Sequence, residues 1–298
     1  MIRIAFLACA DTLPGPGPRR GDAFEHDLEI AALRPAFEAA GFDLVEIDWR
    51  APLETFDGAA LALLGTAWDY QDYPQDFLAK LDALAGKGIT VCNPPEIVRW
   101  NVDKGYLLDL SERDVPIIPT VWHDDATRAD ISAALDRFET DRVVVKRRVG
   151  AGALGQHSFS RDALPDTDWR MGHACLIQPF LASVVEEGEF TFVFIDGAFS
   201  HGVLKQAAAG DYRIQSLYGG KESVFAPSTT DLASARAVIS ALPFAAPLYA
   251  RIDMARLPSG DLAVMEAEMI EPYLYPEQGP DLGERLAKAV LSRLERSA

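Results

Sequence analysis

Segments of strand length alternate with segments of helical periodicity over the first 95 residues, and no other feature of the sequence limits the fold as strongly. A strand, a helix and a further strand in succession are typical of a parallel sheet whose helices pack on its faces. We therefore expect residues 1–95 to form a doubly wound α/β domain. The expected strands are 2–8, 42–47, 61–65 and 89–92, and the expected helices are 25–40 and 77–85.

The pattern changes after Asn93-Pro94-Pro95, where strands follow one another through turns. Asp196-Gly197 is a two-residue hairpin signal between two apolar runs, and Pro258-Ser259-Gly260-Asp261 marks a second hairpin. We expect two α+β subdomains here, a central one over residues 96–180 and a C-terminal one over residues 181–298. The expected strands are 143–146, 175–178, 190–195, 198–204, 249–254 and 262–268, with a loop and strand at 116–120, and the expected helices are 103–113, 128–138, 232–242 and 282–296.

The charge of the chain excludes two classes of partner. The sequence has 28 Lys and Arg residues against 45 Asp and Glu residues, which gives a formal net charge of −17. A surface this acidic repels nucleic-acid backbones and anionic membranes, so we expect neither as a partner. The three cysteines form neither a disulfide framework nor a paired metal motif, and the apolar stretch after Met1 is too short for an export signal. These features favour a reducing, cytoplasmic location.

A glycine-rich loop, Gly150 to Gly155, follows the expected strand 143–146 and matches the spacing GxGxxG. The residues after Gly155 indicate a second strand rather than a helix, which argues against a dinucleotide-binding loop. They also lack the Lys-Ser/Thr pair of a Walker loop. The loop is therefore interpreted as a hairpin tip whose backbone N–H groups can bind phosphate, with Lys146 as a nearby cation. The alternative is an ordinary hairpin with an exposed lysine.

Three carboxylates fall on the second hairpin. If Ser259-Gly260 is its two-residue turn, Asp253 faces Glu266, and Glu268 lies two residues further along on the same face. Opposed carboxylates among apolar neighbours are destabilising unless a counter-charge is present. A divalent cation supplies that charge, and oxygen ligands favour Mg²⁺ or Mn²⁺ over zinc. The alternatives are a solvated edge hairpin, or a local salt bridge to Arg251 or Arg256.

Over roughly residues 95–275, the order of these motifs resembles the ATP-grasp superfamily, and within it the glutathione-synthetase-like branch. The resemblance implies an α/β N-terminal domain followed by two α+β subdomains that form an ATP-grasp fold. It implies that Lys104 and Lys146 bind the ATP phosphates. The loop with Gly150, Gly152 and Gly155 would close over the triphosphate.

The same resemblance assigns the remaining nucleotide contacts. The strand that ends near Gln178, Phe180 and Leu181 would hold the adenine edge, and Glu189 would bind the ribose hydroxyls. Lys205 and Arg213 are implied as catalytic cations for the transferring phosphoryl group and the acyl phosphate. The implied magnesium ligands are Asp253, Glu266 and Glu268. In relatives the last ligand is often Asn, so Glu268 adds a negative charge, and how a second metal is shared stays open.

The resemblance implies an ATP-dependent carboxylate-amine ligase that acts on an amino acid or a small peptide-like substrate. Its cofactors would be ATP and Mg²⁺, with Mn²⁺ as a substitute, and its products would include ADP and phosphate. An acyl phosphate would be the intermediate. The partners would be a small-molecule carboxylate and an amine, and the family also implies a homodimer.

Several segments outside the ATP motifs, such as Gly65-Thr66-Ala67-Trp68-Asp69-Tyr70, resemble the D-cycloserine-forming ligases of this superfamily. They leave three alternatives open, namely an intramolecular cyclising ligase, a small-molecule kinase and a nucleotide-binding module without turnover. An open α/β sheet presents ligands at the carboxyl ends of its strands. The residues that we expect to shape the acceptor pocket are Trp68, Asp69, Tyr70, Glu271 and Tyr273, although interdomain packing is the alternative role of Trp68 and Tyr70. His201 is interpreted as a packed histidine rather than a base.

Overall fold

The computed structural model describes residues 1–150, 152, 155–207 and 219–297, and its N-terminal part contains a parallel sheet. The strand order is β2-β1-β3-β4, and all three pairings are parallel, which confirms the expected α/β arrangement. The elements are β1 (Ile2–Ala8), α1 (Ala23–Ala39), β2 (Phe42–Asp48), β3 (Ala59–Thr66), α2 (Pro74–Gly86) and β4 (Thr90–Cys92), with short 3₁₀ turns at Leu53–Phe56 and Tyr70–Asp72.

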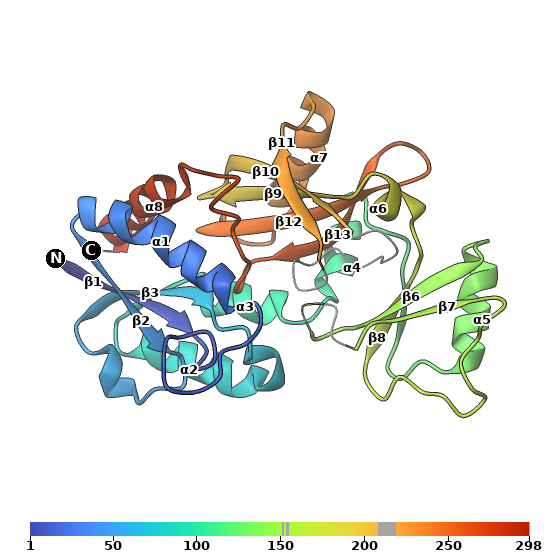
Figure 1. Ribbon diagram of the computed structural model, residues 1–298, viewed down its shortest axis with the longest axis horizontal. Coiled ribbons are helices and arrows are strands. Elements are labelled where there is room, and N and C mark those ends of the chain that lie inside the picture. Colours follow the sequence, from blue (N-terminus) through green and yellow to red (C-terminus); the bar gives the residue numbers. More distant parts are fainter. Residues whose placement is uncertain (151, 153–154, 208–218, 298) are drawn as a thin grey trace.

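A second sheet, of four antiparallel strands, forms the end of the molecule furthest from the parallel sheet (Figure 1). Its order is β5-β8-β6-β7, and its small core includes Ile131, Val143 and Ile177. The glycine-rich loop connects β6 to β7, as expected for a hairpin tip. The elements are β5 (Val121–His123), α5 (Arg128–Arg137), β6 (Arg142–Arg147), β7 (His157–Ser160) and β8 (Cys175–Pro179).

The third sheet lies between the other two and has the order β11-β10-β9-β12-β13, with every pairing antiparallel (Figure 1). Asp196 and Gly197 both have positive φ, 48° and 78°, which confirms the predicted tight hairpin between β9 and β10. The elements are α6 (Ala182–Glu186), β9 (Glu189–Ile195), β10 (Ala198–Gln206), β11 (Lys221–Phe225), α7 (Thr229–Ser240), β12 (Tyr249–Arg256), β13 (Leu262–Glu268) and α8 (Leu282–Ser297).

The hairpin of β12 and β13 differs from the expectation at its turn but not at its carboxylates. Leu257 N donates to Asp261 O, so Pro258 does not pair with Asp261 as expected. A β-bulge between Asp253 and Met254 then shifts the register by one residue. Because the bulge compensates for the longer turn, Asp253 lies directly opposite Glu266, as the sequence predicts.

The two faces of the five-stranded sheet have opposite chemistry because side chains alternate along each strand. On one face Phe190, Phe192 and Phe194 of β9 join Ile252 and Met254 of β12 in an apolar core. On the other face, polar and charged residues of β9, β10, β12 and β13 lie together, while Val193 of β9 packs in the core shared with the N-terminal part. We call this the charged face, and it consists of Glu189, Thr191, Lys205, Arg251, Asp253, Glu266 and Glu268.

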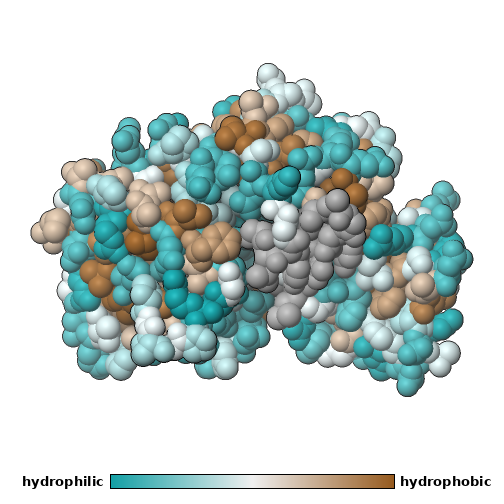
Figure 2. All heavy atoms as spheres, viewed as in Figure 1, coloured by the Kyte–Doolittle hydropathy of each residue, from teal (hydrophilic) through white to brown (hydrophobic). Residues whose placement is uncertain are grey.

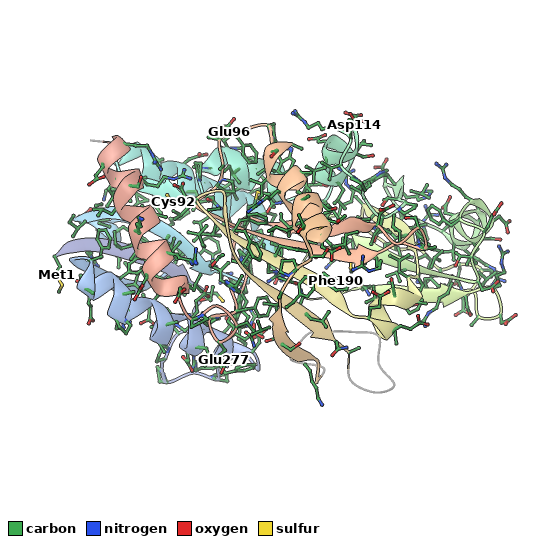
Figure 3. All side chains as sticks on the ribbon, turned by 90° about the horizontal axis from the view of Figure 1, so that it is seen from above. Met1, Cys92, Glu96, Asp114, Phe190 and Glu277 are labelled. Atoms are coloured by element: carbon green, nitrogen blue, oxygen red, sulfur yellow. The ribbon has the colours of Figure 1, made fainter. Side chains whose placement is uncertain are left out.

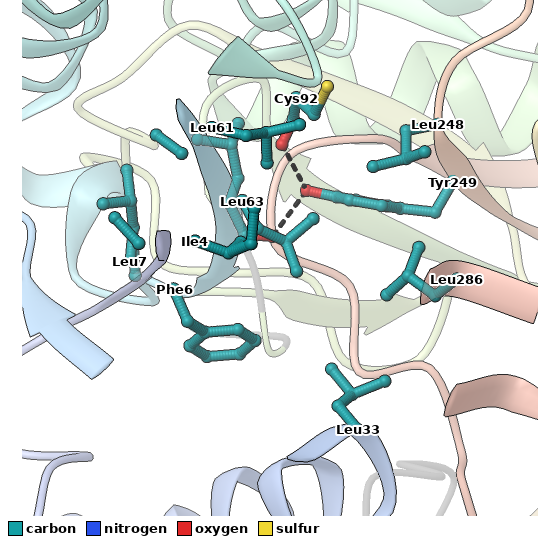
Figure 4. Packing of buried hydrophobic residues seen from close by; sticks show 14 of the residues in the cluster. Ile4, Phe6, Leu7, Leu33, Leu61, Leu63, Cys92, Leu248, Tyr249 and Leu286 are labelled. Atoms are coloured by element: carbon teal, nitrogen blue, oxygen red, sulfur yellow. Dashed lines mark hydrogen bonds between the residues drawn. The ribbon is translucent and has the colours of Figure 1, made fainter. Parts of the chain in front are cut away.

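The parallel sheet and the five-stranded sheet share a single core. The phenol of Tyr249, from β12, packs among residues of β1 and β3 (Figure 4). Its hydroxyl lies 2.5 Å from the carbonyl oxygen of Leu64, 2.8 Å from that of Ile270 and 3.5 Å from that of Cys92. Asn93 adds bonds from its side chain to the backbone of Tyr249 and Met269 at 2.9 and 2.8 Å. These contacts join the N-terminal part firmly to the sheet that carries the charged face.

Helix α8 returns to the N-terminal part and lies beside α1 (Figure 1). A Cβ at Gly283 would lie only 2.4 Å from the carbonyl oxygen of Ala32, so glycine is what permits this close approach. Helix α1 therefore packs against a helix that follows it by more than 200 positions in the sequence.

The connection between the first two sheets is less regular than expected. Instead of one helix over 103–113, α3 (Pro95–Asn101) and α4 (Tyr106–Ser111) flank a turn. The Asp103 carboxylate accepts from Gly105 N at 2.7 Å, a local bond that competes with helical pairing. The turn places Lys104 between two helices rather than within one.

The surface carries no large apolar feature on the view of Figure 2, where hydrophilic residues are spread over the described part of the face. The most exposed large apolar side chains come from separate elements, for example Phe24 and Val224. Among the described residues, no helix is long and apolar enough to span a membrane. The three cysteines are buried and free, as expected.

Candidate active site

The turn between α3 and α4 places Lys104 at the edge of the charged face. Lys104 Nζ lies 2.8 Å from Glu266 Oε1 and also donates to the carbonyl oxygen of Gly150 at the base of the glycine-rich loop. Its backbone N–H donates to Arg148 O at 2.9 Å. One lysine thus connects β13 with the hairpin of β6 and β7. Three residues that the sequence assigned to ATP binding and metal binding meet here.

Lys146 lies near the same carboxylate, on β6. Burial lowers the pKa of Lys146, and the charge of Lys104 lowers it further, whereas Glu266 acts in the opposite direction. Lys104 and Lys146 therefore both lie near Glu266, where two cations are available to an anionic ligand.

In the middle of the charged face, Lys205 of β10 contacts the Glu189 carboxylate and lies 3.1 Å from Asp253 Oδ1. The Thr191 hydroxyl donates to the same oxygen of Asp253 at 2.6 Å. Burial opposes ionisation of Asp253, but Arg251 and Lys205 outweigh it and lower its pKa to about 2. Asp253 is therefore a carboxylate at any physiological pH.

Arg251 belongs to this centre, although sequence reasoning treated it only as a salt-bridge alternative. Its guanidinium lies 3.0 Å from Asp253 Oδ2 and contacts the Glu268 carboxylate. Burial raises the pKa of Glu268 to about 7, with Arg251 opposing the rise and Glu266 adding to it. The signal was present in the sequence, because Arg251 lies two residues before Asp253 and therefore on the same face.

The three predicted metal ligands are gathered on one face, and each is paired with a cation. Within the described ranges, no group of three or more His, Cys, Asp and Glu side chains is arranged to hold a metal ion. The salt bridges of Asp253 and Glu268 to Arg251 match one of the alternatives considered for this hairpin. The donor set, three carboxylates beside a backbone-rich loop, nevertheless fits a hard cation such as Mg²⁺.

A pocket opens beside the charged face, with about 310 Å³ of open space. Its wall combines the N-terminal part, the turn before α4, the glycine-rich loop and β13. Of the residues predicted to act in the site, six line it together. The lining residues are Tyr70, Asn101, Val102, Lys104, Tyr106, Gly150, Glu266, Ala267, Glu268 and Glu271.

The residues expected near adenine lie apart from that pocket, on and after β8. Gln178 is buried and donates to the Thr120 hydroxyl at 3.0 Å. The Phe180 backbone N–H donates to Arg142 O at 2.9 Å, and the Arg142 guanidinium lies 4.1 Å from the Phe180 ring centroid. Leu181 packs in a small apolar cluster with Ile118. Their adenine contacts stay a prediction.

The expected acceptor residues divide between the pocket and the packing of the two sheets. Tyr70 and Glu271 line the pocket, whereas the Trp68 indole donates to Glu271 O at 3.0 Å and so connects the two parts of the chain. Asp69 accepts from the Trp49 indole at 2.6 Å and pairs with Arg50 at 2.7 Å.

Two further residues that the sequence analysis singled out, Tyr273 and His201, are held by packing contacts. The ring of Tyr273 is buried and packs against Tyr275. The imidazole of His201 lies 2.9 Å from Leu274 O, and burial lowers its pKa to about 4, which fits the expected packed histidine.

The remaining predicted residues concern the loops. Gly152 and Gly155 have φ of 61° and 67°, a left-handed conformation that glycine adopts without strain. Arg213, predicted as a catalytic cation, lies outside the described residues.

In sequence, the chain resembles the D-cycloserine synthetases. A family model described as the N-terminal domain of D-cycloserine synthetase DcsG matches residues 4–93. The chain is 26% identical over 286 residues to the cycloserine biosynthesis protein DcsG of Streptomyces lavendulae, a match that covers 90% of this chain and 95% of that protein.

The solved structures show the same fold. The crystal structure of D-cycloserine synthetase DcsG matches with a TM-score of 0.80 and 24% identity, covering 98% of this chain and 99% of that one. The D-alanine–D-alanine ligase from Bacillus anthracis in complex with ATP has a TM-score of 0.68 and 16% identity, at 99% and 98% coverage. The ATP-grasp ligase PsnB, solved with a precursor variant, Mg and ADP, has a TM-score of 0.65 and 17% identity, at 98% coverage of both chains. The predicted ATP-grasp fold is thereby confirmed.

Proposed function

We propose that this chain, an ATP-grasp protein of the ligase type that resembles D-cycloserine synthetase, joins a small carboxylate to an amine with conversion of ATP to ADP and phosphate. The observation that carries the proposal is the pairing of opposite charges on the charged face. Lys104, Lys205 and Arg251 are held by the carboxylates Glu266, Glu189 and Asp253, and Glu268 is held by Arg251 as well.

This pairing suits a site that exchanges its partners when a nucleotide binds. Buried charges are tolerated when each has a counter-charge, and breaking such a pair is strongly unfavourable. A triphosphate with its divalent cation brings negative charge on the phosphates and positive charge on the metal ion at the same time. The lysines can then turn to phosphate oxygens while the carboxylates accept the cation, so neither set is left uncompensated.

The chemistry proposed for the substrate has two steps. A carboxylate oxygen of the substrate attacks the γ-phosphorus, the bond to the β,γ-bridging oxygen breaks, and ADP leaves from an acyl phosphate. An amine nitrogen then attacks the acyl carbon, the bond to the phosphate oxygen breaks, and the amine loses a proton as phosphate departs. Neither step needs a protein nucleophile, because ATP activates the carboxylate.

The chain's own side chains would act by position and charge. Lys104 and Lys146 would hold the phosphates beneath the glycine-rich loop, and Lys205 would balance charge on the transferring phosphoryl group. Arg251, which pairs with Asp253 and Glu268, would stabilise negative charge on the acyl oxygen. Arg213 is proposed as a second cation for the acyl phosphate, on the family resemblance alone. Closure of the loop would keep water from the intermediate.

Asp253, Glu266 and Glu268 would hold Mg²⁺, with Mn²⁺ as a substitute, once Arg251 and Lys104 release them. The cation would supply neutralisation of the phosphate oxygens. For the nucleoside, Glu189 is proposed at the ribose and the backbone near Gln178, Phe180 and Leu181 at the adenine. These assignments rest on the motifs in the sequence.

A second candidate is cyclisation of a single substrate that carries both the carboxylate and the attacking nitrogen. The likeness to D-cycloserine synthetase over nearly the whole chain favours it. The two candidates share the activation step and differ only in whether the nucleophile belongs to a second molecule. A small-molecule kinase would stop after phosphoryl transfer.

Measuring the products separates these reactions. Purified protein is incubated with Mg·ATP and panels of carboxylates and amines, and ADP, phosphate and organic products are quantified. ADP and free phosphate that require both a carboxylate and an amine support ligation, whereas release with a single amino-acid-like substrate supports cyclisation. A stable phosphorylated product identifies a kinase. ATP binding without any substrate-dependent ADP contradicts the proposed ligase.

A further inference from the structure

An aromatic ring from the segment between β13 and α8 lies beside two cations of the charged face. This return segment, residues 269–281, includes Glu277, which is labelled in Figure 3. The ring centroid of Tyr275 is 5.7 Å from Lys205 Nζ and 5.6 Å from Arg251 Cζ, and all three residues are buried. The face of an aromatic ring attracts a cation within about 6 Å of its centroid, and the attraction is stronger where water is excluded.

The backbone of Tyr275 is held in a conformation that this residue disfavours. Its φ is 52°, in the left-handed region that bulky side chains rarely adopt. Pro276 follows it, and a residue before proline normally has an extended conformation. The other non-glycine residues with positive φ in the described ranges are acids at turns, namely Asp114, Glu139 and Asp196. A strained backbone of this kind persists only where the surroundings determine it, and it is frequent at functional sites.

Two strands of the five-stranded sheet hold the return segment in place. From β12, Arg251 donates to Tyr273 O at 3.3 Å. From β10, the His201 imidazole lies 2.9 Å from Leu274 O. The Tyr273 ring also packs edge-on against the Tyr275 ring, with the two centroids 4.8 Å apart. The contacts of its neighbours therefore offset the strain of Tyr275 and keep its ring beside the two cations.

We propose that Tyr275 is a positioning residue that orients Lys205 and Arg251 for the chemical steps. The inference rests on the proposed function, which assigns these cations to the transferring phosphoryl group and the acyl oxygen. Without a nucleotide, carboxylates also hold both cations. Lys205 pairs with Glu189 and Asp253. Arg251 pairs with Asp253 as well.

A ring is suited to this role because it does not exchange partners when Mg·ATP binds. The carboxylates would then accept the metal ion, and the two cations would lose part of their pairing. A ring face attracts cations without offering Mg²⁺ an oxygen ligand. Burial raises the pKa of Tyr275 and outweighs Lys205 and Arg251, so the phenol is neutral and the attraction comes from the ring face. Tyr275 therefore supplies a contact that both cations can keep during the exchange.

The test varies the electrons of the ring while its shape is kept. Tyr275→Phe keeps the aromatic face, and Tyr275→Leu replaces it with an aliphatic side chain. Phenylalanines with one, two and three ring fluorines are then introduced at position 275, because each fluorine weakens the negative face with little change in size. Phe194→Leu is the matched control, since it removes a buried ring from the apolar face of the same sheet.

Three quantities are measured for each variant, namely the kcat of ADP release, the affinity for Mg·ATP by equilibrium binding, and the melting temperature. The substrate is the carboxylate and amine, or the single molecule, that gives the highest rate in the panel described above. If Tyr275→Leu does not fold, the fluorinated series decides the question alone, because every member of it keeps the ring.

We expect Tyr275→Leu to lower kcat by about 10–100-fold, the effect of losing a desolvated contact between a ring and a cation. Tyr275→Phe should stay within about threefold of the wild type, and kcat should fall stepwise with each added fluorine. The affinity for Mg·ATP should change by less than about threefold, because the proposed contacts act on groups that develop charge during the reaction. Phe194→Leu should lower the melting temperature and leave kcat nearly unchanged.

Three results would overturn the positioning role while leaving the proposed ligase intact. The first is an equal kcat across the fluorinated series. The second is a loss of Mg·ATP affinity in Tyr275→Leu with an unchanged kcat, which would make Tyr275 a nucleotide-binding residue. The third is an equal fall of kcat in Tyr275→Leu and Phe194→Leu, which would assign Tyr275 to packing alone. If the wild type binds ATP but no substrate raises ADP release, the proposed function itself fails and the positioning role with it.

Discussion

The two faces of the five-stranded sheet use the same strands for different purposes. Along β9, Phe190, Phe192 and Phe194 point into an apolar core, while Glu189 and Thr191, which alternate with them, belong to the charged face. Residues that are neighbours in sequence are thus stabilised differently. The phenylalanines are buried against apolar side chains, and the residues of the charged face are buried against counter-charges. Stability and chemistry are separated here by the two-residue period of a strand rather than by distance along the chain.

The largest effect is expected on the charged face. Glu266→Gln removes the charge that faces Asp253 and pairs with Lys104, so we expect kcat to fall by at least about 10²–10³-fold. The variant should still fold, because the lysine keeps its bond to Gly150 O, but loss of the pair with Lys104 should lower the melting temperature. Initial rates of ADP release and thermal unfolding are measured on the same preparation. Normal activity in this variant would show that the metal assignment is wrong.

The apolar face should behave in the opposite way. Phe192 is fully buried, and we expect Phe192→Ala to lower the free energy of unfolding by about 3–5 kcal/mol through lost burial and a cavity. The kcat of the fraction that remains folded should be close to that of the wild type. Urea titrations give the stability, with Phe24→Ala as an exposed control. A large loss of kcat in folded Phe192→Ala would contradict the claim that the apolar face contributes to stability and the charged face to catalysis.

A buried acid away from the charged face sharpens the comparison. Glu29 of α1 is 2% exposed, and its Oε2 has no hydrogen-bond partner among the residues that the structure describes. Burial, and next the charge of Glu25, raise the pKa of Glu29 to about 8, whereas Arg251 and Lys205 hold the pKa of Asp253 at about 2. Burial is common to both residues, so the counter-charges explain the opposite directions.

The raised pKa of Glu29 gives stability a specific pH dependence. Below about pH 4.5, the ordinary pKa of this acid, both the folded and the unfolded states hold the proton. Between that value and about pH 8, the folded state binds more protons, so its stability falls as pH rises, by up to about 1.4 kcal/mol per pH unit. Glu29→Gln should flatten this decline in melting temperature across pH 5–8. An identical decline in the variant would contradict the shift.

The smallest effect is expected at Thr191, which adjoins Phe192 but lies on the charged face. Thr191→Val keeps the shape and removes the hydroxyl that donates to Asp253. A hydrogen bond to a charged group contributes about 1.5–3 kcal/mol, so we expect kcat/KM to fall by about tenfold or somewhat more. Thr230→Val, at the exposed start of α7, serves as the comparison. A loss of stability as large as that of Phe192→Ala would contradict a mainly functional role.

Local patterns predicted the elements and much of the site. Apolar runs bounded by turn signals located most of the strands, although the strand expected within 116–120 lies at Val121–His123 and β11 was not predicted. The carboxylates at positions 253 and 266 were predicted to face one another. That pairing was correct even though the turn was not, because the bulge restored the register after a longer loop. Hairpins are local structures, so their register is determined largely by residues that are close in sequence.

Local sequence patterns could not predict the features that depend on contacts between segments far apart in the sequence. The role of Trp68 as a bond between the two sheets requires knowing that Glu271 lies beside it. The pairing of Asp69 with Arg50 likewise places an expected substrate residue within a salt bridge. The domain limits near residues 95 and 180 stay predictions. The roles in nucleotide binding also stay predictions, since a bound nucleotide is needed to test them.

The contact between α8 and α1 has a consequence for synthesis on the ribosome. Domains generally fold in the order in which they emerge, N-terminal first. Here the first sheet emerges early, yet the helix that covers α1 is encoded after every other element of the described fold. Part of the apolar surface of the nascent N-terminal part therefore stays exposed until α8 has been synthesised. Chaperones that bind emerging chains recognise exposed apolar surface of this kind.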